Sequence, residues 1–191
     1  FLSGVIAALS SKTGKIAYVG PTEMQSINES MAGFKQGAEW AVPGIEVILT
    51  YIGTGTDVGK AKESAIALIN NGVDVIQINC NQAGQGVIEA GLENIGKVVI
   101  IPSNAIMTDK YPDLILADMP NENYAAGVDK VLKDIIEGNF TVGGYEMGVG
   151  DSETCIPSKH MNIPEEHLEK FEAAKQGIID GSIVVSRVLE K

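Results

Sequence analysis

Four short apolar segments alternate with longer helical segments in the first half of the chain. They lie at residues 15–19, 45–52, 73–78 and 97–101, and each is largely apolar without strict alternation of polar and apolar positions. Such strands are covered on both faces, as in a parallel sheet between layers of helices. Short connections and right-handed crossovers then join each strand to the next. The sequence therefore predicts an α/β fold with a parallel sheet flanked by helices.

The segment 72–92 shows this repeating unit most clearly. An apolar strand at 73–78 is followed by a polar loop at 79–85 and then by a helix. In an open α/β sheet, ligands bind outside the carboxyl ends of the strands, where this loop is expected. An ordinary strand-to-helix connection, with glycines for tight packing, remains an alternative. The loop offers amide side chains and glycines that would let a ligand approach the backbone: Asn79, Asn81, Gln82, Gly84 and Gly86.

After Pro102 the regular alternation ends. The pattern predicts an amphipathic helix at 121–137, with apolar residues on one side and charged residues on the other. A last helix is predicted at 164–179. Shorter strands are predicted at 114–117, 145–149 and 183–188.

The charge of the chain limits its partners. The formal net charge is −11 and the pI is about 4.6, and lysines and arginines are scattered without a basic run. This balance argues against binding to nucleic acid or to an anionic membrane surface. No apolar run approaches the length of a membrane-spanning helix.

Groups that carry out catalysis are scarce in this sequence. The only histidines, His160 and His167, lie in polar segments and are interpreted as surface residues. Gly53–Gly59 differs in spacing from a dinucleotide-binding loop. Cys80 and Cys155 lack metal-ligand spacing, so one disulfide or two buried thiols both remain open. We therefore predict no enzyme activity, no cofactor and no metal site. Carboxylates near the later helix are interpreted as solvated charges and caps: Asp113, Asp118, Glu122 and Asp129.

A polar but non-catalytic set of residues follows the carboxyl ends of the strands. Amides and hydroxyls recognise neutral polar molecules by hydrogen bonds, so this set favours a binding protein over an enzyme. The set comprises Glu23, Gln25, Asn28 and Ser30 after the first strand, Asn79, Asn81 and Gln82 after the third, and Ser103 and Asn104 after the fourth.

Several further segments carry a resemblance through their order and spacing. They are residues 1–9 with 12–20, 32–38, 51–57 with Ala65, 72–76, 84–87, 137–145 (Glu-Gly-Asn-Phe-Thr-Val-Gly-Gly-Tyr) and 178–183 (Ile-Ile-Asp-Gly-Ser-Ile). Together they cover nearly the whole chain. In this pattern the chain resembles the basic membrane protein family, the substrate-binding lipoproteins of nucleoside ABC importers.

This resemblance implies the type I periplasmic binding protein fold, with two α/β lobes, three crossings and a cleft between the lobes. It assigns residues 15–115 and 145–191 to the second lobe. It assigns 1–12 and 118–142 to a first lobe that is N-terminally incomplete in this chain, because family members carry more sequence ahead of Phe1. The uncapped helical start of the chain agrees with that expectation.

The chain departs from the family pattern at positions that bind the ligand. Ser30 stands where the family usually has an aromatic residue that stacks on the base. The segment 102–107 lacks the family's acids to the ribose, and a family lysine is absent near 117–120. The ligand implied is therefore a nucleoside, a base or another small polar solute.

The sequence predicts the extracytoplasmic solute-binding component of an ABC importer, either membrane-anchored or periplasmic. Its partners would be a small polar ligand, nucleoside or purine-like, and an ABC permease, with no nucleic acid. A ligand-sensing regulator of the same fold is the alternative, and an enzyme of a flavodoxin-like or Rossmann-like fold is a weaker one. The predicted ligand-binding residues are Ser30, Asn79, Asn81, Gly84, Gly86 and Asn104.

Overall fold

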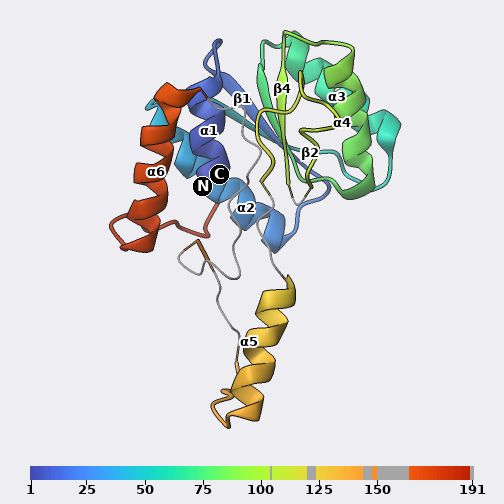
Figure 1. Cartoon of the computed structure of the whole chain (residues 1–191). Helices are drawn as coiled ribbons and strands as arrows, with labels where there is room; N and C mark the ends of the chain where they lie inside the picture. The colour runs from blue at the N-terminus through green and yellow to red at the C-terminus, as the bar shows by residue number, and fades with distance from the viewer. Residues whose placement is uncertain (104, 120–123, 144–147, 150–163, 190–191) are drawn as a thin grey trace.

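The computed structural model describes residues 1–103, 105–119, 124–143, 148–149 and 164–189. Its central sheet has four parallel strands in the order β2–β1–β3–β4 (Figure 1). These are β1 (Lys15–Gly20), β2 (Glu46–Tyr51), β3 (Val75–Ile78) and β4 (Val99–Pro102). The α/β fold with a parallel sheet is therefore confirmed. Each strand lies within its predicted segment or extends one residue beyond it.

Helices cover both faces of this sheet (Figure 1). Alternate strand residues face opposite layers, so that Tyr18 lies in one apolar core and Ala17 and Val19 lie in the other. Because both layers are apolar, the strands read as largely apolar runs. The core with Ala17 is covered by α3 (Val58–Asn70) and α4 (Gly84–Leu92), and the core with Tyr18 by α1 (Leu2–Ser10), α2 (Gln25–Ala41) and α6 (Glu165–Ile179).

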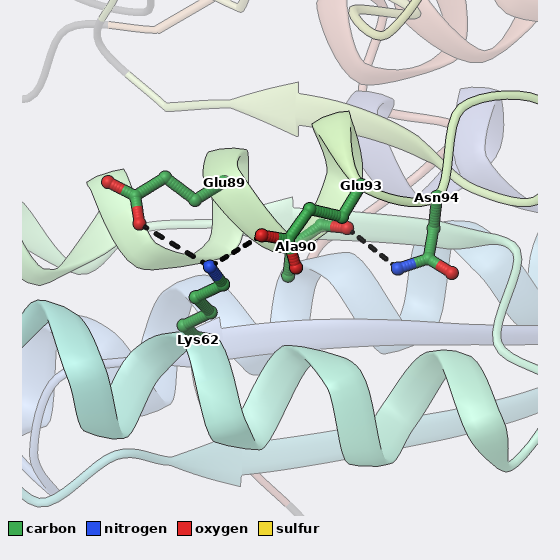
Figure 2. Close-up of polar contacts among 5 residues, drawn as sticks. All are labelled: Lys62, Glu89, Ala90, Glu93 and Asn94. Carbon is green, nitrogen blue, oxygen red and sulfur yellow. Dashed lines mark hydrogen bonds and ion pairs between the residues drawn. The ribbon is translucent and has the colours of Figure 1, made fainter.

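The pair α3 and α4 packs closely because a glycine stands at the contact. A Cβ atom on Gly86 would lie 2.0 Å from the carbonyl oxygen of Val58. Figure 2 shows the polar side of the same pair, where Lys62 of α3 reaches between Glu89 and Glu93. Its Nζ lies 2.7 Å from Glu93 Oε1 and 3.9 Å from Glu89 Oε2. Backbone contact and ion pairs together fix α4 against α3.

The first helix, α1, belongs to the same packed unit as the sheet. Its buried residues Val5 and Ile6 share one core with Tyr18 of β1. Gly4 lets the helix approach the backbone of α2. The apolar face of α1 is thus buried against α2 and the sheet, and the assignment of residues 1–12 to a first lobe stays a prediction.

The helix α5 (Tyr124–Ile136) extends away from the two layers (Figure 1). It confirms the helix predicted at 121–137 over the residues that the structure describes. Val128, Leu132 and Ile135 of its apolar side keep exposed fractions of 58%, 49% and 52%. The assignment of this helix to a different lobe stays a prediction.

The end of the chain differs from the predicted strand at 183–188. Residues 184–189 have no regular secondary structure and run along α2 rather than along a sheet edge. Gln36 Nε2 donates to the Ser186 carbonyl at 2.8 Å, and Gln36 Oε1 accepts from the Ser186 N–H at 2.9 Å. A side-chain amide therefore takes the place of a neighbouring strand.

Two other predicted strands have different outcomes. The segment at 114–117 forms an isolated parallel bridge, Ile100 with Ile115, rather than a full strand. Most of the segment predicted at 145–149 lies outside the described residues, as do Cys155 and His160.

Candidate ligand-binding site

A cavity of about 570 Å³ lies at the carboxyl ends of β3 and β4. This is the edge of a parallel sheet at which ligands bind in open α/β folds. The lining residues come from the end of β3, from the loop and helix that follow it, and from the segment after β4. They are Ile78, Asn79, Cys80, Asn81, Gln82, Gly84, Gln85, Pro102, Ser103, Ala105 and Met107.

The loop after β3 is held in place by backbone contacts. Asn81 has a φ of 50°, in the left-handed region that asparagine tolerates better than most residues. The N–H of Ala83 donates to the Gly55 carbonyl at 3.0 Å, which ties this loop to the loop after β2. The thiol of Cys80 donates to the Val19 carbonyl at 2.9 Å. These bonds fix the loop over the end of the sheet.

Cys80 is a structural rather than a reactive residue of this loop. Its side chain is buried and carries a free thiol. Burial raises the pKa of the thiol from 9.0 to about 12, so the thiolate that would act as a nucleophile is scarce at neutral pH. A disulfide with Cys155 stays an open question, because Cys155 lies outside the described residues.

Two hydrogen bonds through the Tyr18 hydroxyl link Asn79 of the loop to Ser30 of α2. Asn79 Nδ2 donates to the Tyr18 hydroxyl at 3.1 Å, and that hydroxyl donates to Ser30 Oγ at 2.8 Å. Tyr18 is fully buried and packs edge-on against Phe34 at 5.5 Å between ring centroids. Burial raises the pKa of Tyr18, and its bonds with Ser30 and Asn79 oppose that effect. Tyr18 therefore acts as a neutral hydroxyl that orients Asn79.

A second buried amide supports the residue that follows β4. Gln77 is 3% exposed, and its Nε2 donates to Ser103 Oγ at 3.0 Å. Among the described residues, Gln77 Oε1 has no hydrogen-bond partner. A buried amide costs free energy unless it is hydrogen-bonded, and the bond that Gln77 makes here orients a hydroxyl at the cavity.

The wall of the cavity formed by 105–108 is anchored by Asp118. This carboxylate is fully buried and accepts hydrogen bonds from the Met107 N–H at 2.8 Å, the Thr108 N–H at 3.1 Å and the Thr108 hydroxyl at 2.5 Å. Three donors satisfy the charge inside the protein. The sequence placed Asp118 among solvated charges and caps, and nothing in its spacing signalled that it would be buried.

The structure brings some of the predicted ligand residues together at this cavity. Asn79, Asn81 and Gly84 line it. Ser30 lies behind Asn79, at the far end of the Tyr18 hydrogen bonds. Gly86 does not line the cavity and faces the Val58 carbonyl of α3. Asn104 lies outside the described residues. The roles of these residues in ligand binding stay predictions.

Sequence reasoning had different signals for the remaining lining residues. Cys80 carries no pattern that marks a ligand site, and only its position after a strand could have indicated it. Pro102, Ala105 and Met107 lie in the segment 102–107, which the resemblance aligns with the family's ribose-binding residues. Among the described lining residues, the Cys80 thiol is the only ionisable side chain. In the described part of the chain, no group of three or more His, Cys, Asp or Glu residues is placed to hold a metal ion. The described lining therefore presents neutral hydrogen-bonding groups together with apolar side chains.

This fold is that of the type I periplasmic binding proteins. An ABC transporter solute-binding protein from Aeropyrum pernix K1 matches 97% of this chain and 63% of its own, with a TM-score of 0.78 and 20% identity. A transcriptional activator of the comK gene from Bacillus halodurans matches with a TM-score of 0.79 and 22% identity, over 97% of this chain and 63% of its own. At these identities the matches show the fold alone.

Sequence comparison identifies the family of this chain, which the fold alone does not. The chain belongs to the family of ABC transporter substrate-binding proteins described as PnrA-like, whose model matches residues 1–150. It is 32% identical to Basic membrane protein D of Borreliella burgdorferi (strain JD1), over 94% of this chain and 54% of that protein. It is 34% identical to Basic membrane protein A of Borreliella afzelii, over 97% of this chain and 57% of that protein. The chain thus spans about half the length of these curated relatives.

Proposed function

We propose that this protein is the extracytoplasmic solute-binding component of an ABC importer. The observation that carries the proposal is a neutral, hydrogen-bonding cavity at the carboxyl edge of the sheet, in a member of a substrate-binding family. The ligand is a small polar solute, nucleoside or purine-like, held between this lobe and a second one. Amide and hydroxyl groups match the heterocyclic nitrogens and the sugar hydroxyls of such a molecule.

The partner of the loaded protein is an ABC permease. In a two-lobe binding protein the ligand makes contacts in the closed state that the open state lacks, so binding shifts the population toward closure. The hinge is proposed near 117–120 and 143–144, of which Pro120 and Gly144 lie outside the described residues. The exposed apolar side of α5 supports the idea that this helix packs in the other lobe, because solvated apolar residues of this size usually have a partner.

The proposed location is outside the cytoplasm, either anchored by a lipid or free in a periplasm. The family assignment supports it. In the described part of the chain, no helix has the length and apolar character that crossing a membrane requires.

The proposal is tested by native mass spectrometry of the purified protein in its full natural length, compared with the same sample denatured. A co-purified adduct with the mass of a nucleoside or a base supports the proposed ligand class. An adduct of a different class keeps the binding function and replaces the ligand. Growth on the identified solute that depends on both this protein and its permease then tests the importer assignment.

A ligand-sensing regulator of the same fold is the second candidate. One observation favours it, namely that the comK transcriptional activator has the same fold by a TM-score of 0.79. A regulator acts on a different partner from a permease. Deletion of the gene would then change transcription without changing uptake of the solute, and the importer would show the reverse.

A further inference from the structure

Two side chains meet at the floor of the cavity, Asn79 after β3 and Ser103 after β4. The parallel register pairs Gln77 with Ile101. Because side chains alternate between the faces of a strand, the next positions on the same face, Asn79 and Ser103, stand side by side. The Ser103 N–H donates to the Ile78 carbonyl at 3.0 Å, which continues the strand pairing to this point.

Both side chains are oriented from beneath by buried groups. One Nδ2 hydrogen of Asn79 is donated to the Tyr18 hydroxyl, which fixes the rotation of the amide and leaves Oδ1 available to accept from a ligand beside the second Nδ2 hydrogen. The Oγ of Ser103 accepts from Gln77 Nε2, which leaves the hydroxyl hydrogen of Ser103 available to donate. By contrast, the lining side chains of Gln82 and Gln85 are exposed.

We propose that Asn79 and Ser103 form an oriented acceptor–donor pair that selects the ligand. The pair recognises an uncharged molecule that presents a hydrogen-bond donor to Asn79 Oδ1 and, beside it, an acceptor to the Ser103 hydroxyl. Tyr18 and Gln77 are positioning residues that set this order and touch no ligand themselves. This inference rests on the proposed function and specifies the chemistry of the ligand group that faces the floor of the cavity.

Two parts of a nucleoside carry this chemistry. The edge of an oxopurine base has an N–H beside a carbonyl oxygen, and the ribose has two neighbouring hydroxyls that donate and accept. A phosphate or carboxylate is disfavoured at the same place, because it would face the Asn79 oxygen and the described lining residues include no cationic side chain.

The test is isothermal titration calorimetry on the protein in its full natural length with three probes. They are inosine, N1-methylinosine, which lacks the donor of the base edge, and a dideoxyinosine that lacks both neighbouring ribose hydroxyls. Loss of one hydrogen-bonded partner in a closed site corresponds to weakening of about tenfold or more. Such weakening for one analogue supports the pair and shows which part of the ligand it contacts.

Substitutions at Asn79 separate recognition from a structural role. Asn79→Asp keeps an acceptor toward the ligand, and the Tyr18 hydroxyl can rotate to donate to the new carboxylate, so inosine affinity should stay within a few-fold. Asn79→Leu removes the acceptor and should weaken inosine by about tenfold or more. Asn71→Asp is the matched control, because Asn71 is exposed at the opposite edge of the sheet.

The outcomes distinguish this inference from the proposed function. If both analogues bind as tightly as inosine, or if Asn79→Asp abolishes binding while Asn71→Asp does not, the pair is wrong and solute binding stands. If neither inosine nor its analogues bind, the nucleoside ligand class and the pair are both overturned. Thermal unfolding of each variant confirms that a loss of binding is not a loss of folding.

Discussion

Gly86 and Gly84 lie two positions apart on α4, and the structure gives them opposite roles. A Cβ atom on Gly86 would lie 2.0 Å from the Val58 carbonyl oxygen and 2.8 Å from the Lys62 backbone nitrogen, whereas ordinary contact begins at 3.4 Å. Backbone atoms cannot rotate away, so in Gly86→Ala the two helices must separate. The same Cβ on Gly84 would meet Ile78 Cδ1 at 3.7 Å, which is an ordinary contact.

The expected cost follows from two opposing effects. Overpacking a well-packed core costs about 1–3 kcal/mol, and alanine in a helix interior regains about 1 kcal/mol relative to glycine. Since the clash at Gly86 is with backbone, we expect the upper part of the first range. The free energy of unfolding of Gly86→Ala should fall by about 2 kcal/mol, which for a chain of this size lowers Tm by about 4–8 °C.

The measurement is urea unfolding of the wild type, Gly86→Ala and Gly84→Ala, followed by far-ultraviolet circular dichroism. Gly84→Ala should be as stable as the wild type or more stable by up to about 1 kcal/mol. Because Gly84 lines the cavity, its substitution should change ligand affinity instead. Equal stability of the two variants would refute the reasoning, since it would mean that α4 does not depend on close approach to α3.

Four further predictions concern ionisable side chains, both buried and exposed. Asp118→Asn leaves the donors around this buried side chain only partly satisfied, so it should lower the free energy of unfolding by about 1–3 kcal/mol. It should also speed hydrogen exchange at 105–108. The control Asp113→Asn, at an exposed carboxylate, should change neither quantity. Cys80 should resist iodoacetamide at pH 8 until the protein unfolds, since burial raises the pKa of its thiol to about 12, and peptide mapping measures this. The same shift means that the folded state retains the Cys80 proton between pH 9 and 12 while the unfolded chain releases it, so stability should fall as pH rises through that window, and Cys80→Ala should lessen the fall. Lys62→Met should leave the midpoint of urea unfolding close to that of the wild type, because its ion pairs (Figure 2) are partly exposed and screened by solvent.

The layers of the fold follow from local properties of the sequence. A parallel sheet between helices could be predicted from four apolar segments, because burial on both faces requires apolar residues at every position of a strand. The start of α3 is local as well, because the Asp57 carboxylate caps the helix by accepting from the Lys60 N–H at 2.9 Å. These signals lie within a few residues of the elements that they determine.

The parts that could not be predicted depend on contacts between distant segments. Asp118 reads as a surface carboxylate, yet it is buried because residues 107–108 turn their donors toward it. Residues 183–188 have the composition of a strand but lie on α2, where Gln36 supplies the hydrogen bonds. Glycines at 84 and 86 look alike in sequence, and only the position of α3 distinguishes a cavity wall from a helix contact.

Of the three buried polar or charged residues in the described part of the chain, Gln77 and Asp118 lie near the carboxyl ends of the strands, and Ser3 lies on α1. Gln77 and Asp118 are almost fully buried, and the Tyr18 hydroxyl lies between Asn79 and Ser30. Apolar side chains in their place would avoid the desolvation cost and pack equally well. Each of these groups instead orients a residue or a loop at the cavity, while the cores on either side of the sheet are apolar. Local departures from an apolar core mark functional sites in folded proteins, and this clustering is therefore an argument for ligand binding that does not depend on any relative.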